Sequence, residues 1–338
     1  MSEQLNVELE SVEAHDEEAS RLQSWPTVAA FDDETEVAQA HSFDNAERIE
    51  IAEQADLQES LRSIQRRLVS VLGVSITDVS KPHACQLLES LASARDGRCR
   101  SVFIVNTHTL NVSAEQPSYR DTLNSAHFVL NDGTGVRWAA RQRGIELCAN
   151  LVGTDLIPDF FQATAHRGYR YFLLGAAPDS IEPAAAFARD RFAGWTQAGY
   201  HHGFVHNRQH EDLVDQINAS GANVLLVGMG NPIQERWIQS QQSKLRVPLA
   251  IGVGGLFDHW INRPKRAPLW VRKMGCEWVH KLILQPHKWR RYLLGNPTFL
   301  LRIARAKQSD LAAMQAGGFM PGAPIPARPI SLFTQQQI

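Results

Sequence analysis

The sequence predicts an α/β fold, in which a mostly parallel sheet is flanked by helices in a Rossmann-like arrangement and is followed by a basic C-terminal helical appendage. Short runs rich in β-branched and aromatic residues alternate with segments whose apolar residues recur at helical spacing. This alternation favours parallel strands, because each crossover helix returns the chain to the same edge of the sheet. The expected strands cover residues 101–105, 128–130, 171–174, 224–227 and 249–253.

Several of these strands end in glycine. Gly175 follows YRYFLL, Gly228 follows NVLLV and Gly252 follows VPLAI. In open α/β sheets, ligands bind beyond the carboxyl ends of the strands. We therefore expect these turns to line a site.

Charge is distributed very unevenly along the 338 residues, although the net charge is only −2. Residues 1–60 contain 17 acidic residues and two arginines, a local charge of −15, with few large apolar side chains. Such a segment buries too little apolar surface to offset its ordering entropy. Residues 263–307 contain twelve Lys or Arg and one Glu, a local charge of +11. The folded part is thus suited to an anionic partner, which the average charge conceals.

These patterns divide the chain into four parts. We expect a disordered acidic arm over residues 1–66, in which residues 45–66 can form a transient helix, and an α/β core over residues 67–262. A basic, aromatic-rich appendage follows over residues 263–310. Residues 311–338, rich in Gly, Pro and Ala near their start, are expected to form a flexible tail.

Cysteine spacing and hydropathy exclude several classes of protein. The four cysteines lie far apart without a CxxC pair, so we expect buried thiols in a reducing compartment rather than a zinc site or a disulfide framework. No stretch approaches 18 uninterrupted apolar residues, and the N-terminus is acidic. Neither a membrane span nor a secretory signal is expected.

Asp132 is the first candidate catalytic residue. It lies in VLNDGTGVRWAA, directly after an expected strand and before an expected helix. A carboxylate at this position can act as a general base, and Gly133 and Gly135 allow close backbone approach. The alternative is that Asp132 only caps the helix, a common role for short polar residues. These residues alone leave both interpretations open.

A second polar cluster, in VNTHTLN, ends another expected strand. Asn106, Thr107, His108 and Thr109 offer the dense set of donors and acceptors that a sugar requires. Capping of the following helix is an equally good interpretation.

The segment from Gly153 through Thr154 and Asp155 predicts the start of a helix that runs to about His166, with Thr154 as the N-cap. Free N–H groups at a helix N-terminus can bind a diphosphate. An ordinary cap is the alternative.

Two further strand ends carry polar or glycine-rich turns. In VGMGNPIQERWI, Gln234 can hydrogen-bond a sugar or leaving group, while Glu235 can simply favour the helix dipole. In IGVGGLFD, the glycines permit backbone contact with a phosphate or ribose, and Asp258 can accept hydrogen bonds from the hydroxyl groups of a ribose. No GxGxxG fingerprint is present, which disfavours a dehydrogenase. The glycines of the second turn are Gly252, Gly254 and Gly255.

The basic appendage interleaves tryptophans with Lys and Arg. This composition is typical of an interfacial helix that meets anionic lipid phosphates. No nucleic-acid-binding module is visible, so no nucleic-acid partner is expected; a solvated helical cap and an acceptor-diphosphate site stay open. The candidate acceptor and membrane residues are Arg266, Trp270, Arg272, Lys273, Trp289, Arg290 and Arg291.

Seven motifs in the same order resemble the WecG/TagA/CpsF glycosyltransferases (glycosyltransferase family 26) over about residues 70–306. They are VNTHTLN, LNDGTGVRWAARQRG, GTDL, YFLLGAAP, INASGANVLLVGMGNPIQERWI, IGVGGLFD and KRAPLWVRKMGCEWVHKLILQPHKWRRYLLGNPTFL. The acidic arm lies outside the resemblance.

The resemblance implies an inverting, metal-independent hexosyltransferase that needs no cofactor. It would move a hexose from a UDP-sugar to a polyprenyl-diphosphate-linked saccharide, as a peripheral protein at the inner face of the plasma membrane, in exopolysaccharide or other cell-surface polysaccharide biosynthesis. The family's proposed base corresponds to Asp132, its glutamine near the sugar to Gln234, and the acid beside its nucleoside pocket to Asp258.

Two departures from the family pattern leave the sugar open. Many relatives have Thr where this chain has Asn106, and Arg where it has Asn150. N-acetylmannosamine, glucose and other N-acetylated or uronic hexoses all stay possible, as does a homo-oligomer. Another nucleotide-dependent α/β enzyme and a non-catalytic membrane-associated partner of a polysaccharide assembly complex are the alternatives from other classes.

Overall fold

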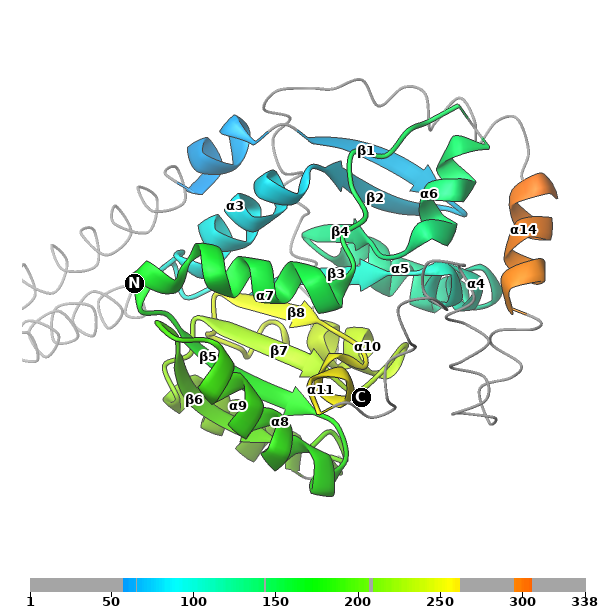
Figure 1. Cartoon of the computed structure of the whole chain (residues 1–338). Helices are drawn as coiled ribbons and strands as arrows, with labels where there is room; N and C mark the ends of the chain where they lie inside the picture. Colours follow the sequence, from blue (N-terminus) through cyan, green and yellow to red (C-terminus); the bar gives the residue numbers. More distant parts are fainter. Residues whose placement is uncertain (1–56, 65, 143, 207–208, 262–294, 306–338) are drawn as a thin grey trace, which may run out of the picture. The chain divides into compact units, whose positions relative to one another are not determined.

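The structure of the chain is a computed structural model that describes residues 57–64, 66–142, 144–206, 209–261 and 295–305 (Figure 1). The predicted tail, nearly all of the acidic arm and most of the basic appendage lie outside these ranges. Within them, no helix combines the length and the apolar character needed to cross a bilayer.

Six parallel strands form the central sheet in the order β4-β3-β8-β7-β5-β6. The five predicted strands are confirmed to within one residue at either end. Four of them are buried along nearly their whole length, which explains why they form continuous apolar runs. The bounds are β3 (Arg100–Val105), β4 (Phe128–Asn131), β5 (Arg170–Gly175), β6 (Thr196–His201), β7 (Val224–Gly228) and β8 (Leu249–Gly252).

Three strands were not predicted from the sequence. The edge strand β6, with the sequence TQAGYH, has no apolar run and is largely half-exposed, so only its pairing with β5 makes it a strand. An antiparallel hairpin, β1 (Arg66–Val71) and β2 (Val74–Val79), forms a separate two-stranded sheet. Its turn places Leu72 and Gly73 at positive φ.

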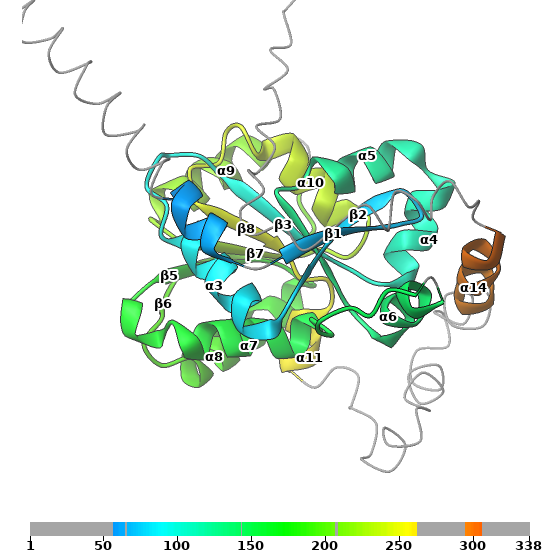
Figure 2. The same ribbon diagram turned by 90° about the horizontal axis from the view of Figure 1, so that it is seen from above.

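Helices cover both faces of the six-stranded sheet (Figure 2). Successive residues of β3 point to opposite faces: Val102 and Ile104 pack on one face, and Phe103 and Val105 on the other. The first face carries α3 (Lys81–Ala92), α7 (Gly153–Ala163), α8 (Pro178–Arg191) and α11 (Leu256–Trp260), with the short helix η1 (Ala165–Arg167) after α7. The second face carries α4 (Thr107–Glu115), α5 (Pro117–Ser125), α9 (His210–Ala219) and α10 (Ile233–Gln241). The same apolar cluster includes α6 (Thr134–Arg141), which contacts β1, and α14 (Gly295–Arg305), which packs on α4.

The end of the segment assigned to the acidic arm is part of the folded core. Residues 57–63 are helical, and Leu57, Leu61 and Ile64 are buried in the same apolar cluster as α3. The predicted boundary at residue 66 is therefore too late. The apolar spacing of four and three residues creates a helical stripe, which the acidic composition of the surrounding segment masks.

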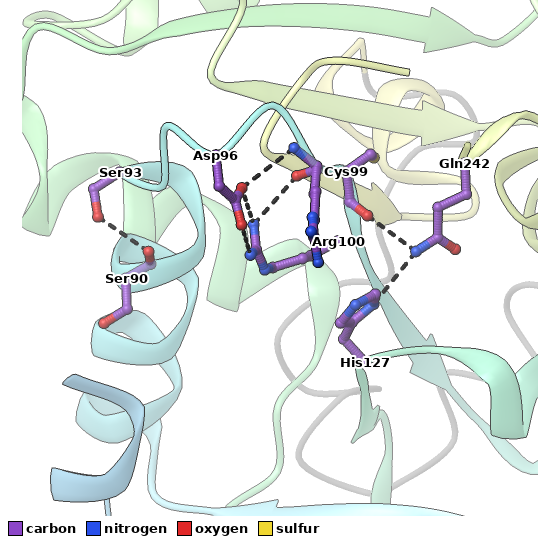
Figure 3. Close-up of polar contacts among 8 residues, drawn as sticks. Ser90, Ser93, Asp96, Cys99, Arg100, His127 and Gln242 are labelled. Atoms are coloured by element: carbon purple, nitrogen blue, oxygen red, sulfur yellow. Dashed lines mark hydrogen bonds and ion pairs between the residues drawn. The ribbon is translucent and has the colours of Figure 1, made fainter. Parts of the chain in front are cut away.

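Polar contacts stabilise the amino-terminal end of β3, opposite the carboxyl ends of the strands, where the predicted site lies (Figure 3). Asp96 and Arg100 form a nearly buried ion pair. Burial alone would raise the pKa of Asp96, but the hydrogen bonds and positive charges of Arg100 and Arg98 together outweigh it and lower this pKa. Gln242 Nε2 donates to the carbonyl oxygen of Cys99 at 3.0 Å and lies 3.4 Å from His127 Nδ1.

The last described helix, α14, packs on α4. Its Phe299 and Ile303 are buried in the apolar cluster of the second face. Asn111 Nδ2 donates to the carbonyl oxygen of Gly295 at 2.6 Å, and Arg302 donates to the carbonyl oxygen of Asn111 at 2.8 Å and forms an ion pair with Glu115. The C-terminal end of the predicted appendage is thereby anchored on the core.

Two neighbouring residues test whether α14 belongs to the cooperative core. Phe299→Ala should lower the free energy of unfolding by about 3 kcal/mol, because it deletes a buried ring. Leu300→Ala should change it by less than about 0.5 kcal/mol, because Leu300 is 43% exposed. Urea unfolding followed by tryptophan fluorescence measures both. Equal effects of the two substitutions would contradict the docking of α14.

Candidate active site

Most of the predicted site residues lie at or after the carboxyl ends of five parallel strands, β3, β4, β5, β7 and β8, and therefore gather at one edge of the sheet. β8 leads into α11 on one face, whereas its neighbours β3 and β7 lead into α4 and α10 on the opposite face. In open α/β sheets, ligands bind beyond the strand ends at such a reversal.

Asp132 extends the pairing of β3 and β4 by one residue. Its backbone N–H donates to the carbonyl oxygen of Val105 at 2.7 Å, and the residue is half-buried. Gly133, with φ of 96°, occupies the N-cap position of α6, and no side chain caps that helix. Asp132 is therefore not the N-cap residue of α6, and its backbone is held by the sheet.

Asn150 holds the residue that follows Asp132. Its Oδ1 accepts a hydrogen bond from the Gly133 N–H at 2.7 Å. The neighbouring Leu151 N–H donates to the carbonyl oxygen of Asn131 at 3.0 Å, and Asn131 Nδ2 donates to the carbonyl oxygen of Ala149 at 2.8 Å. These bonds fix the segment before α7 against the end of β4 and restrain the backbone on the C-terminal side of Asp132.

Asn106 caps α4, so the capping alternative is confirmed for this residue. Its Oδ1 accepts hydrogen bonds from the N–H groups of His108 and Thr109, and the Thr109 hydroxyl lies 3.4 Å from the Asn106 N–H. Thr107 and His108, both half-buried, form the first turn. A Cβ added at Gly135 would lie 2.3 Å from Thr107 Cγ2, so this glycine allows the starts of α4 and α6 to approach each other.

The start of α7 lies beside the end of β4 but differs in detail from the prediction. Val152, not Thr154, occupies the N-cap position, and no side chain caps the first turn. The expected end near His166 is also too late, because α7 ends at Ala163 and residues 165–167 form η1. Gly153 is buried, Thr154 is half-buried and Asp155 is exposed. The positive end of α7 therefore lies at the sheet edge without a side-chain cap.

Gln234 is buried and joins the turns that follow β7 and β8. Its Oε1 accepts hydrogen bonds from the Gly230 N–H at 3.3 Å and the Gly254 N–H at 2.9 Å, and its Nε2 donates to Glu235 Oε1 at 2.8 Å. The Gly254 N–H, one of the amides expected to meet a diphosphate, is thus already paired within the protein. The side chain of Gln234 supports the two turns from inside, with only 1% of the residue exposed.

Glu235 is fully buried next to Gln234. Its Oε1 also accepts a hydrogen bond from Asn231 Nδ2, and its side chain faces the hydroxyl of Tyr119 on α5. Burial raises the pKa of Glu235, against the hydrogen bonds from Gln234 and Asn231, which lower it. The same burial, together with the nearby Glu235 carboxyl, raises the pKa of Tyr119.

The glycines at the strand ends serve two different purposes. A Cβ at Gly175 would lie 2.4 Å from the Gly228 carbonyl oxygen, and one at Gly252 would lie 3.1 Å from Gln234 Nε2, so both positions are packed against protein. In contrast, a Cβ at Gly133, Gly254 or Gly255 would have no atom within 4 Å. Only the second group leaves room for a ligand to approach the backbone.

The remaining predicted residues lie on α11 or outside the described ranges. Asp258 is exposed on α11, which begins directly after the Gly252–Gly255 turn. Across the described part of the chain, His, Cys, Asp and Glu side chains form no group of three or more that could hold a metal ion. The predicted acceptor and membrane residues lie outside the described residues: Arg266, Trp270, Arg272, Lys273, Trp289, Arg290 and Arg291.

Sequence reasoning overlooked three residues that shape this edge. Asn150 was noted only as a departure from a family pattern, Glu235 only as a helix-dipole residue, and Tyr119 not at all. Tyr119 and Asn150 are distant in sequence from the groups they contact, and no local spacing reveals such contacts. The burial of Glu235 depends on the packing of α10 against α5, which periodicity alone does not specify.

Comparison with known proteins identifies relatives over most of the chain. A family model described as glycosyl transferase WecG/TagA/CpsF family matches residues 69–312. Curated proteins from Staphylococcus aureus strains NCTC 8325 and MRSA252 are each 26% identical to this chain over 242 residues, which is 71% of this chain and 93% of each relative. Both are named N-acetylglucosaminyldiphosphoundecaprenol N-acetyl-beta-D-mannosaminyltransferase. The match includes all seven motifs, so the resemblance is confirmed.

The hydrogen bond from Gly133 to Asn150 can be tested by a pair of substitutions. Asn150→Ala should lower the free energy of unfolding by about 1 kcal/mol, because it leaves the half-buried Gly133 N–H without its acceptor. Asn150→Asp keeps an acceptor oxygen and should therefore lower the free energy of unfolding by less than Asn150→Ala. Chemical denaturation measures both values; a larger loss for Asp than for Ala would argue against this role of Asn150.

Proposed function

Because the chain belongs to the WecG/TagA/CpsF family of glycosyltransferases, we propose that it transfers a hexose from a UDP-sugar to a polyprenyl-diphosphate-linked saccharide. The names of the staphylococcal relatives support this acceptor class, since they specify a sugar attached to diphosphoundecaprenol. N-acetylmannosamine, glucose and related hexoses are the candidate donor sugars. The product would enter bacterial exopolysaccharide or another cell-surface polysaccharide.

The observation that carries the proposal is the position of Asp132 within the matched range. Its half-buried carboxylate follows β4 at the sheet edge, and its backbone is held on one side by Val105 and on the other by Asn150. In the proposed reaction, this carboxylate removes the proton from the acceptor hydroxyl. The hydroxyl oxygen then attacks the anomeric carbon from the face opposite UDP, so that a single displacement inverts the configuration.

The diphosphate of the donor would lie across the same edge. The open backbone at Gly255 and the uncapped start of α7 at Gly153 and Thr154 supply candidate N–H donors. Without a metal ion, such donors together with Arg or Lys side chains must stabilise the charge on departing UDP. Asp258, exposed on α11, is the candidate partner for the ribose.

The basic appendage would hold the lipid-linked acceptor. Its twelve basic residues against one acid favour contact with a diphosphate and with the anionic inner face of the plasma membrane. Peripheral association at that surface would bring the acceptor to the strand-end edge. The proposal needs no membrane-spanning segment and no resident cofactor.

The decisive experiment offers a panel of UDP-hexoses to the purified full-length protein with an undecaprenyl-diphosphate-linked sugar as acceptor. One donor should give a product heavier by one sugar residue, read by mass spectrometry, and the rate should be unchanged by EDTA. No product with any donor, although UDP binds, would favour the non-catalytic partner. Binding of a nicotinamide or methyl-donor cofactor without UDP would favour another nucleotide-dependent enzyme.

The role of Asp132 is tested separately by Asp132→Asn. Transfer should fall at least about 100-fold, because the amide cannot accept the proton of the acceptor hydroxyl. The melting temperature and the Kd for UDP should change little, since the substitution keeps the size of the side chain. Turnover close to the wild-type rate would exclude Asp132 as the base.

A further inference from the structure

The buried carboxyl group of Glu235 has no part in the proposed chemistry, yet it touches Gln234, which joins two turns of the candidate site. Glu235 is 0% exposed, and its Oε1 accepts hydrogen bonds from both Gln234 Nε2 and Asn231 Nδ2. Burying a carboxyl group is costly unless its hydrogen bonds compensate. This cost suggests a role beyond filling space.

The side-chain amide of Gln234 can form hydrogen bonds with all of its neighbours in only one orientation. Its Oε1 faces two backbone donors, the N–H groups of Gly230 and Gly254, and its Nε2 faces the acceptor Glu235 Oε1. A flipped amide would place its NH₂ against the two N–H groups and its oxygen against the carboxylate. All three contacts would then be repulsive.

The Gln234 amide is a side-chain link between two glycine-containing turns, in addition to the backbone bonds from Gln234 N–H to the Gly230 carbonyl oxygen and from Val253 N–H to the Val227 carbonyl oxygen. Gly230 and Gly254 have φ of 82° and 59°, and a Cβ at either position would have no atom within 4 Å. Neither glycine is therefore held by side-chain packing at its own Cβ position. The amide oxygen of Gln234 bonds to both backbones at once.

We propose that Glu235 is a positioning residue, which orients the Gln234 amide and thereby sets the spacing between the turns after β7 and β8. Asn231 Nδ2, in the turn after β7, holds the carboxyl group in turn through its hydrogen bond to Oε1. The consequence for catalysis rests on the proposed function, in which these turns border the UDP-sugar. The positioning itself does not depend on that function.

The positioning is measured by hydrogen exchange of the Gly254 amide. Labelling with ¹³C-carbonyl valine and ¹⁵N-glycine restricts the NMR spectrum to Val–Gly pairs, of which the chain has three, at Gly153, Gly228 and Gly254. Glu235→Leu removes the acceptor at similar volume and should accelerate exchange at Gly254 about tenfold, whereas Glu235→Gln keeps an acceptor oxygen and should stay within about twofold of wild type. The other two amides serve as internal controls.

Swapping the side chains of residues 234 and 235 gives a second test, which does not depend on whether Glu235→Leu folds. Gln234→Glu places two carboxylates side by side and should accelerate exchange at Gly254 about tenfold. Combining it with Glu235→Gln restores one donor and one acceptor and should return exchange to within about twofold of wild type. Glu235 does not position this amide if the Gly254 amide exchanges as fast in the double variant as in Gln234→Glu. The same conclusion follows if Glu235→Leu folds but its Gly254 amide exchanges no faster than in the wild type.

Gln239→Ala is the matched control on the same helix. Gln239 lies within hydrogen-bond distance of Thr122 and Ser125 on α5 but contacts neither turn, so its loss weakens the same helix pair without touching Gln234. Exchange at Gly254 should therefore stay at the wild-type rate. Acceleration equal to that of Glu235→Leu would assign the effect to general loosening of α10 and overturn the proposal.

Binding of UDP separates this inference from the proposed function. If both are right, Glu235→Leu and Gln234→Glu should weaken the Kd for UDP about tenfold, and the double variant should restore it. Faster exchange at Gly254 with an unchanged Kd for UDP would support the positioning role and contradict the placement of the donor at these turns. In the transfer assay, the expected change is mainly in the KM for the donor rather than in kcat.

Discussion

The pairing of β8 with both β3 and β7 is the constraint on which the rest of the structure depends. The strands β3 and β4 form one half of the sheet, and β5, β6 and β7 form the other; β8 alone joins them. All four residues of β8 are buried, so both ladders lie in the apolar interior, where an unpaired backbone group is costly. The chain direction reverses at β8, because β8 continues to the face opposite its two neighbours, and ligands bind at such switch points in open α/β sheets.

The polar contacts at this edge follow from that arrangement. Once the strand ends lie side by side, the following turns must satisfy their own N–H groups, and side chains of this chain accept from several of them. Asn150 accepts from Gly133, Asn106 from the first turn of α4, and Gln234 from the turns after β7 and β8. In the proposed reaction, such support would keep the Asp132 carboxylate in place without reorganisation, which is the main electrostatic advantage of an enzyme site.

The docking of α14 adds a connection between the core and the basic appendage. Phe299 and Ile303 bury the apolar face of α14, and Arg302 binds α4, whose first turn carries Thr107 and His108. The appendage follows α11 in sequence, and its described part, α14, is docked on α4. Both α11 and α4 carry residues of the candidate site, which is consistent with a role of the appendage in binding the acceptor.

The sequence by itself determined the parallel α/β class, five strands and the strand-end position of Asp132, because continuous burial and helical periodicity are local properties of the chain. Only the tertiary structure decided which polar groups are already paired. It shows Asn106 as a cap, Gln234 inside the protein and Gly175 packed against Gly228, and it makes a strand of the polar segment β6. These outcomes depend on contacts between residues far apart in the chain, which local patterns do not encode.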